Sequence, residues 1–296
     1  MLSLPMDLAI RIPFRRAFPS FALLLFALAF LISGCGGGGG NSGANSTVEF
    51  RILARVPTVG HNLYKFTLNN LESTIVGPSF NLSELAGITQ RDVDGFLYTY
   101  GTDNDSIFSF DPDTGEMFLH GSSGVDLPFA EYGMDIDPIS GEWRMMSVEN
   151  NERISVLDTS HIASETPPTP STDIQAIAFT PSSGNPGTTT LYGIDQGNVN
   201  LCRIGGVNGT PSPNDGEVEI IGPLGISNEL IQGFEIATNG KAYLLTVRQG
   251  DNAIFLYTVN LSTGAATQIG QVEGEASPFA GEIIGFCLVE RQAPSP

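Results

Sequence analysis

Lysine, cysteine and long helical runs are all scarce in this sequence of 296 residues. Only Lys65 and Lys241 are lysines, and 13 basic residues stand against 32 acidic ones, which leaves a formal net charge of −19. A surface this acidic repels the phosphate backbone of nucleic acids. We therefore expect no nucleic-acid partner. The acidic balance instead favours solubility in salty surroundings or attraction of cations.

Cysteine and histidine are too few and too dispersed to indicate a metal site. Besides Cys35, the chain has only Cys202 and Cys287, each within an apolar segment. An exported protein permits a disulfide, but these two segments belong to different parts of the repeat described below, so we expect two buried thiols. The histidines occur singly, which argues against zinc; they are His61, His120 and His161.

Common catalytic motifs are also missing. The sequence has no Gly-x-Ser-x-Gly nucleophile elbow, no phosphate-binding loop and no dinucleotide fingerprint. The acidic segments 92–95 and 103–105 lack the Glu that closes a twelve-residue calcium loop. We therefore expect no cofactor and no metal centre, with calcium as the one cation left open.

The N-terminus has the pattern of a bacterial lipoprotein signal. Three arginines precede an apolar run over residues 21–32 that is too short to span a bilayer comfortably. The run ends in Ile32-Ser-Gly-Cys35, which resembles a lipobox, in which the cysteine is diacylated. We predict a signal peptide over residues 1–34 with Cys35 as the lipidated residue. The alternative is an ordinary secretory signal with a chance cysteine.

The next segment predicts a tether. Residues 35–48 begin with a glycine run from Gly36 to Gly40 and continue with Asn, Ser, Gly and Ala, a composition typical of flexible linkers. Gly at position 36, in place of Asp, favours the outer membrane. We expect a cell-envelope protein that touches the membrane only through its lipid, on either the periplasmic or the external side, and a disordered tail over residues 291–296.

Residues 49–290 repeat a unit of four short apolar segments joined by turns. Small residues recur at the start of each unit about every fifty positions, which is typical of a β-propeller blade. They suit places where innermost strands approach one another closely. The aligned residues are Gly87, Gly133, Ala176, Gly233 and Gly285.

The repeat is split between the two ends of this domain. Residues 63–66 have the pattern of the third strand of a unit, yet they precede the first strand that carries an aligned glycine. The last strand with an aligned glycine, residues 283–289, is followed by no further strand pattern in the sequence. The simplest arrangement pairs residues 283–289 with strands in residues 49–77. We predict an all-β fold, a single five-bladed β-propeller closed by pairing the C-terminal strand with the N-terminal blade, because closure removes exposed sheet edges. We expect a monomer.

The polar loops of such a propeller share one face. Turns after the first and third strands are short and rich in Pro and Gly, while those after the second and fourth strands are longer and more polar. Loops on a rigid scaffold commonly carry function, although Asn, Asp and Gly also suit turns for purely local reasons. The candidate ligand residues on this face are Asp103, Asp105, Asn151, Arg153, Asp195 and Asp251.

Two carboxylates share one repeat position, since Asp135 and Glu235 each follow an aligned glycine by two residues. Paired acids near a propeller axis act as acid and base in five-bladed glycosidases, and carboxylate oxygens also hold cations. A glycan-cleaving enzyme that uses this pair is therefore the alternative hypothesis. The leading hypothesis is a lipid-anchored binding module, without enzymatic activity, for a protein or a saccharide.

Several segments resemble the bacterial domain of unknown function 4394 family. Examples are Tyr132-Gly-Met-Asp-Ile-Asp-Pro138, Gly233-Phe-Glu-Ile236 and Leu256-Tyr-Thr-Val-Asn-Leu-Ser-Thr-Gly264, and together the matches span most of residues 50–289. The resemblance implies an exported, propeller-like protein and assigns no activity. The segment from Arg144 to Arg153 is one residue shorter than the family pattern, which alters the geometry of any family site there.

Overall fold

The computed structural model describes residues 48–290 except positions 83, 126, 128–131 and 182–186. Contacts between Cα atoms divide the chain into Met1–Ala44 and Asn45–Pro296, and the described residues all belong to the second unit. The predicted signal peptide, Cys35 and the 291–296 tail lie outside the described residues. Within those residues, no helix has the length and apolar character needed to cross a membrane.

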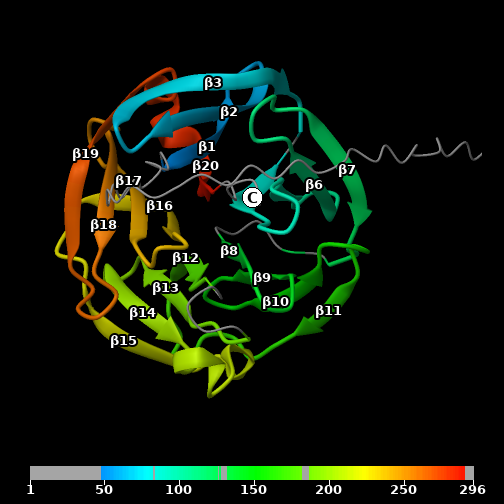
Figure 1. Cartoon of the computed structure of the whole chain (residues 1–296), viewed down its shortest axis with the longest axis vertical. Coiled ribbons are helices and arrows are strands. Elements are labelled where there is room, and N and C mark those ends of the chain that lie inside the picture. Colours follow the sequence, from blue (N-terminus) through cyan, green and yellow to red (C-terminus); the bar gives the residue numbers. More distant parts are fainter. Residues whose placement is uncertain (1–47, 83, 126, 128–131, 182–186, 291–296) are drawn as a thin grey trace, which may run out of the picture. The chain divides into compact units, whose positions relative to one another are not determined.

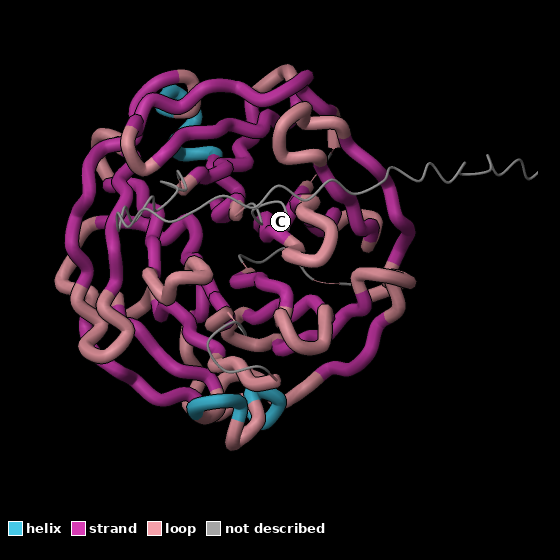
Figure 2. Tube along the Cα trace, viewed as in Figure 1, coloured by secondary structure: helices cyan, strands magenta, loops and turns pink. Residues whose placement is uncertain are grey.

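In the described part of the chain, nearly all the regular secondary structure is β-strand, and Figure 2 shows helix only in short segments. These segments are the 3₁₀ helices η2 (Val207–Gly209), η3 (Pro213–Asp215) and η4 (Ser277–Glu282). The absence of sustained helical periodicity in the sequence predicts this composition. The all-β prediction is confirmed.

Three sheets each consist of four consecutive antiparallel strands. The first contains β4 (Leu85–Gln90), β5 (Leu97–Gly101), β6 (Ser106–Phe110) and β7 (Met117–Ser122). The second contains β8 (Gly133–Ile136), β9 (Glu142–Met146), β10 (Asn151–Ser155) and β11 (His161–Ser164). The third contains β12 (Ile174–Phe179), β13 (Leu191–Asp195), β14 (Asn200–Ile204) and β15 (Val218–Pro223).

A fourth sheet has the order β16-β17-β18-β19-β3-β2-β1-β20. One half contains β16 (Glu229–Ile236), β17 (Ala242–Arg248), β18 (Ile254–Val259) and β19 (Ala266–Gly274). The other half contains β1 (Glu49–Val56), β2 (Gly60–Thr67), β3 (Asn70–Phe80) and β20 (Ile283–Val289). Among the described strands, the halves are hydrogen-bonded to each other through a short parallel pairing of β19 with β3, at Glu273↔Glu72 and Gly274↔Ser73.

The C-terminal strand pairs with the N-terminal strand. β20 and β1 are antiparallel, from Glu49↔Val289 to Leu53↔Gly285. This pairing is the one that the split repeat predicts, because a four-strand unit lacking its first strand at one end is completed by the extra strand from the other end.

Burial changes systematically from the first strand of a sheet to the last. All residues of β5 and β6 are buried, whereas β7 is mostly exposed. Strands that are covered on both faces read as continuous apolar runs rather than alternating ones. The core between the two halves of the fourth sheet includes aromatic rings: Phe50 of β1 stacks on Phe66 of β2 at 5.0 Å and meets Tyr243 of β17 edge-on at 5.1 Å between centroids.

The five strands β4, β8, β12, β16 and β20, here called the inner strands, contact one another in that order, and β20 also contacts β4. Figure 1 shows the sheets of this unit around a common centre. A Cβ atom on Gly285 would lie 2.7 Å from the backbone nitrogen of Ile88, and one on Gly133 would lie 2.8 Å from the carbonyl carbon of Ala176. The predicted close approach at the aligned small residues is therefore present at these two positions.

The two cysteines within the described residues are free and buried, as the sequence predicts. Cys202 lies in β14 and Cys287 in β20, in different sheets.

Candidate functional site

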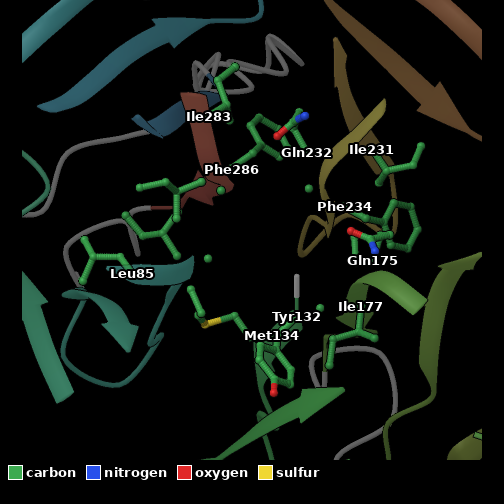
Figure 3. A pocket seen from close by; sticks show the side chains of 18 residues that line it. Leu85, Tyr132, Met134, Gln175, Ile177, Ile231, Gln232, Phe234, Ile283 and Phe286 are labelled. Atoms are coloured by element: carbon green, nitrogen blue, oxygen red, sulfur yellow. The ribbon is translucent and has the colours of Figure 1, made fainter. Parts of the chain in front are cut away.

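Two cavities lie along the inner strands, one at each end. The first, of about 200 Å³, is lined by the N-terminal halves of all five inner strands (Figure 3). The second, of about 210 Å³, is lined by their C-terminal ends and the turns that follow. The first cavity lies at the same edge of the sheets as the turns between second and third strands. This follows because Glu229, at the start of β16, pairs with Arg248, at the end of β17. That is the edge where the sequence places the polar loops.

Bulges in the inner strands shape the first cavity. The pairing of β12 with β13 skips Gln175, that of β16 with β17 skips Gln232, and that of β20 with β1 skips Ile284. A bulge leaves the extra residue outside the ladder and re-aims its side chain. All three bulged residues line the first cavity. The pairing of β4 with β5 is also irregular, between Ala86 and Thr89.

The first cavity is uncharged, since none of its lining residues is Asp, Glu, Lys, Arg or His. The Gln175 amide donates to Asp173 Oδ1 at 3.1 Å. The Gln232 carboxamide makes no hydrogen bond within the part of the chain that the structure describes. Figure 3 shows both glutamines around the same opening as Ile231 and Phe234. The site therefore combines carboxamides with apolar surface.

The second cavity contains the two predicted inner-strand acids, and Asp135 is held firmly. Only 8% of Asp135 is exposed. Its Oδ1 accepts hydrogen bonds from Thr89 Oγ1 at 2.8 Å and from its neighbour Ile136 N at 2.7 Å, and its Oδ2 accepts one from Phe179 N at 2.7 Å. The side chain thus links β8 with β4 and β12. Burial raises the pKa of Asp135 to about 7, although these hydrogen bonds act in the opposite direction.

Glu235 lines the same cavity, but no described residue holds its carboxyl group as Asp135 is held. It is partly exposed and makes no hydrogen bond or ion pair with any described residue. Burial, followed by the negative charges of Asp135, Asp92 and Glu290, raises its pKa well above the ordinary value. Within the described residues, no three His, Cys, Asp or Glu side chains are arranged to hold a metal ion.

This arrangement gives the two acids different roles. Both oxygens of Asp135 are occupied by donors of the protein, so Asp135 is not free to act as a nucleophile or base. Glu235 retains its proton above the ordinary pKa and can donate a hydrogen bond. The paired-acid hypothesis, which needs two available carboxyl groups on one substrate, has no support from this geometry.

The four aspartates among the loop candidates have different surroundings. In the turn between β5 and β6, Asp103 is exposed and Asp105 adopts a φ of 53°. Asp195 is buried and accepts from Gly197 N at 3.0 Å, which stabilises its own turn. Asp251 is exposed and forms an ion pair with Arg248. The structure does not bring these aspartates together into one group.

The two strand candidates are structural contacts as well. The Asn151 side chain is 1% exposed, accepts from Arg144 Nη1 and donates to the carbonyls of Thr166 and Pro213. Arg153 forms ion pairs with Glu142 and Glu165. Burial lowers the pKa of Arg144 to about 10.

A family model described as domain of unknown function (DUF4394) matches residues 62–281. The chain belongs to the DUF4394 family. No curated protein matches this DUF4394 sequence. The Arg144–Asn151 contact lies within the matched range, where it joins β9 to β10.

The solved structures that match this DUF4394 protein share little sequence with it. A nidogen/laminin complex is 13% identical with a TM-score of 0.44, covering 82% of this chain and 86% of that one. A structural genomics protein of unknown function from Bacteroides thetaiotaomicron is 16% identical with a TM-score of 0.47, covering 76% and 59%. The Kuenenia stuttgartiensis hydrazine synthase is 12% identical with a TM-score of 0.39, covering 64% and 50%.

Gln175 and Gln232 were not among the residues that the sequence singles out. A glutamine within an apolar strand has no local signature of function. The available signal is positional, because each glutamine directly precedes an aligned small residue, Ala176 or Gly233.

Proposed function

We propose that this DUF4394 protein is an exported five-bladed β-propeller, anchored by a lipid on Cys35, that binds a ligand in the first cavity. The cell envelope, with the outer membrane as the anchoring bilayer, is its proposed location. The anchor rests on the lipobox-like Ile32-Ser-Gly-Cys35 and on Gly36 behind it.

The contacts among inner strands support the five-bladed part of the proposal. Each inner strand begins or completes a group of four antiparallel strands, and the five contact one another in a sequence that returns from β20 to β4. The short β19–β3 pairing then joins the outermost strands of two neighbouring blades.

One observation carries the binding function. The bulged Gln232 lines the first cavity, and its carboxamide has no hydrogen-bond partner among the described residues. Polar groups that fix the orientation of a ligand within an otherwise apolar cavity are typical of binding sites. The cavity volume of about 200 Å³ is below the range of roughly 300–1,000 Å³ common for drug-sized ligands. The ligand is therefore a small molecule or the end of a longer one.

Blocking the cavity tests this function. The full chain, purified in detergent, is screened by thermal shift against neutral and charged oligosaccharides, amino acids and short peptides. The Ile284→Trp variant places a larger side chain at a bulged position of the cavity. Leu119→Trp makes the same kind of change on β7, where Leu119 is 63% exposed.

We expect at least one ligand class to raise the melting temperature of the native protein and of Leu119→Trp, and to leave Ile284→Trp unchanged. Circular dichroism checks that both variants fold. Failure of every class to bind, or binding that Ile284→Trp does not weaken, would contradict the proposed function.

A further inference from the structure

The lining of the first cavity restricts the charge of its ligand. None of its lining residues is ionisable at neutral pH, whereas Asp92, Asp135, Glu235 and Glu290 all line the second cavity. A charged group moved from water into a partly apolar cavity loses hydration, and without an opposite charge nearby that loss is not compensated. The first cavity therefore favours an uncharged ligand.

The two bulged glutamines define the polar pattern of that ligand. A carboxamide offers two N–H donors and one carbonyl acceptor. The Gln175 amide already donates to Asp173, which orients the group, while Gln232 has all its donors and its acceptor unused by described residues. Hydroxyl groups both donate and accept, so neighbouring hydroxyls on a ring match two carboxamides.

The apolar lining matches the other face of such a ring. Ile283 and Ile284 line the same cavity as the glutamines and are partly exposed, so a ligand can reach their side chains. A pyranose presents C–H groups on its faces and hydroxyls at its edge, so it can pack against apolar side chains while its edge bonds to amides. The small volume accommodates the terminal ring rather than a whole chain.

We infer that the first cavity binds the terminal ring of an uncharged saccharide, with Gln175 and Gln232 hydrogen-bonded to its hydroxyls. This inference rests on the proposed function, because it names the ligand class of that site.

Calorimetric titration of the full chain tests the inference with defined probes. The neutral probes are maltose, cellobiose and N,N′-diacetylchitobiose, and the charged probes are the corresponding terminal uronic acid and amino sugar. The variants are Gln175→Ala, Gln232→Ala and Gln232→Glu. The control is Gln268→Ala, which removes an exposed glutamine from the outer strand β19.

We expect a neutral disaccharide to bind, and each Gln→Ala change in the cavity to raise its Kd by up to about tenfold, the effect of one lost hydrogen bond. Gln268→Ala leaves the Kd unchanged. The uronic acid binds at least about tenfold more weakly, because its charge has no partner. Gln232→Glu shifts the preference toward the amino sugar, a gain that damage to the fold would not produce.

Two results would overturn the inference while leaving the proposed function intact. One is cavity-dependent binding of a peptide or amino acid with no neutral saccharide bound. The other is saccharide binding that Ile284→Trp abolishes but that neither glutamine variant nor ligand charge affects. Failure of every ligand class in the thermal-shift screen, amino acids and peptides included, would instead contradict the proposed function.

Discussion

The carboxylate of Asp135 in β8 accepts a 2.7 Å hydrogen bond from the backbone N–H of Phe179 in β12. One side chain therefore satisfies a backbone donor of the neighbouring sheet, in a place where water has little access. Buried backbone donors without a partner are costly, so this contact couples the position of β12 to that of β8.

Removing the Asp135 carboxylate is expected to destabilise the fold. Asp135→Ala leaves the amides of Phe179 and Ile136 without an acceptor, which costs roughly 1–3 kcal/mol even after the buried charge is relieved. Thr89→Val removes only one donor to the same carboxylate and costs about 1 kcal/mol. Urea denaturation at pH 8 measures both. An Asp135→Ala protein as stable as the native protein would show that the contact adds nothing to the free energy of unfolding.

Stability is expected to fall as pH rises toward neutrality. Burial and nearby charges hold the pKa of Glu235 well above 4.5 in the folded protein, and the pKa of Asp135 is about 7. The unfolded chain loses these protons near its ordinary pKa values of about 4. Above that pH the unfolded state binds fewer protons than the folded state, so the free energy of unfolding decreases until the folded pKa is passed.

Glu235→Gln separates the contribution of one acid. The neutral carboxamide carries no ionisable proton, so we expect the variant to be less sensitive to pH between 5 and 8 and more stable than the native protein at pH 7. Urea midpoints at four pH values in that range give both slopes. Equal slopes for the two proteins would show that the Glu235 pKa is not raised.

His61 is expected to make the folded protein less stable as the pH falls below neutrality. Its ring is 1% exposed, neither ring nitrogen has a hydrogen-bond partner among the described residues, and it stacks on Phe80. Burial, with a smaller contribution from Arg55, lowers its pKa to about 4. The unfolded chain is protonated first, below 6.5, so stability is lost as pH falls from about 6.5 to 4.

His61→Phe is expected to remove that loss and to leave the stability at pH 7 the same or higher, because the ring stacks without unsatisfied nitrogens. The same replacement at exposed His120 is the control for hydrophobic change alone. Melting temperatures from pH 4.5 to 7 measure the effect. A native pH profile in His61→Phe would assign the acid sensitivity to other groups.

A single methyl group at Gly285 is expected to disturb the contact between β20 and β4. The new Cβ would lie 2.7 Å from the Ile88 nitrogen and 2.8 Å from the Gly87 Cα. Overpacking of this kind costs typically 1–3 kcal/mol. At Gly281 the nearest atom to a Cβ is Asn252 Nδ2 at 3.8 Å, so Gly281→Ala is the matched control and should be neutral. Equal stability of the two variants would show that β20 adjusts freely.

The two free cysteines are expected to be inert in the folded protein. Burial raises the pKa of Cys202 to about 12 and that of Cys287 well above its ordinary value, so the reactive thiolate is scarce at both. In a Cys35→Ser variant, a thiol reagent such as Ellman's reagent should react only after urea is added. Rapid reaction of either thiol without denaturant would mean that its segment opens readily.

Much of the fold could be predicted from local patterns. Apolar segments of five to eight residues between Pro, Gly and Asp turns place the strands within a few residues, because turn chemistry and strand burial act over short distances. The phase of the repeat also predicts the pairing of β20 with β1. The candidate ligand residues are less informative, since Asp195 and Asn151 have the polarity of ligand residues but use it to satisfy buried backbone and side-chain groups.

The sequence by itself determined the strands, the four-strand repeat, the pairing of its split end and the family, because each is written in local residue types and their spacing. Only the tertiary structure decided what the polar residues of the inner strands do. Asp135 and Glu235 share a repeat position, yet one is bound by three donors and the other by none among the described residues. Gln175 and Gln232 reach the first cavity because one extra residue bulges out of each ladder. Such differences depend on contacts between strands about fifty residues apart in the sequence, and no local pattern records them.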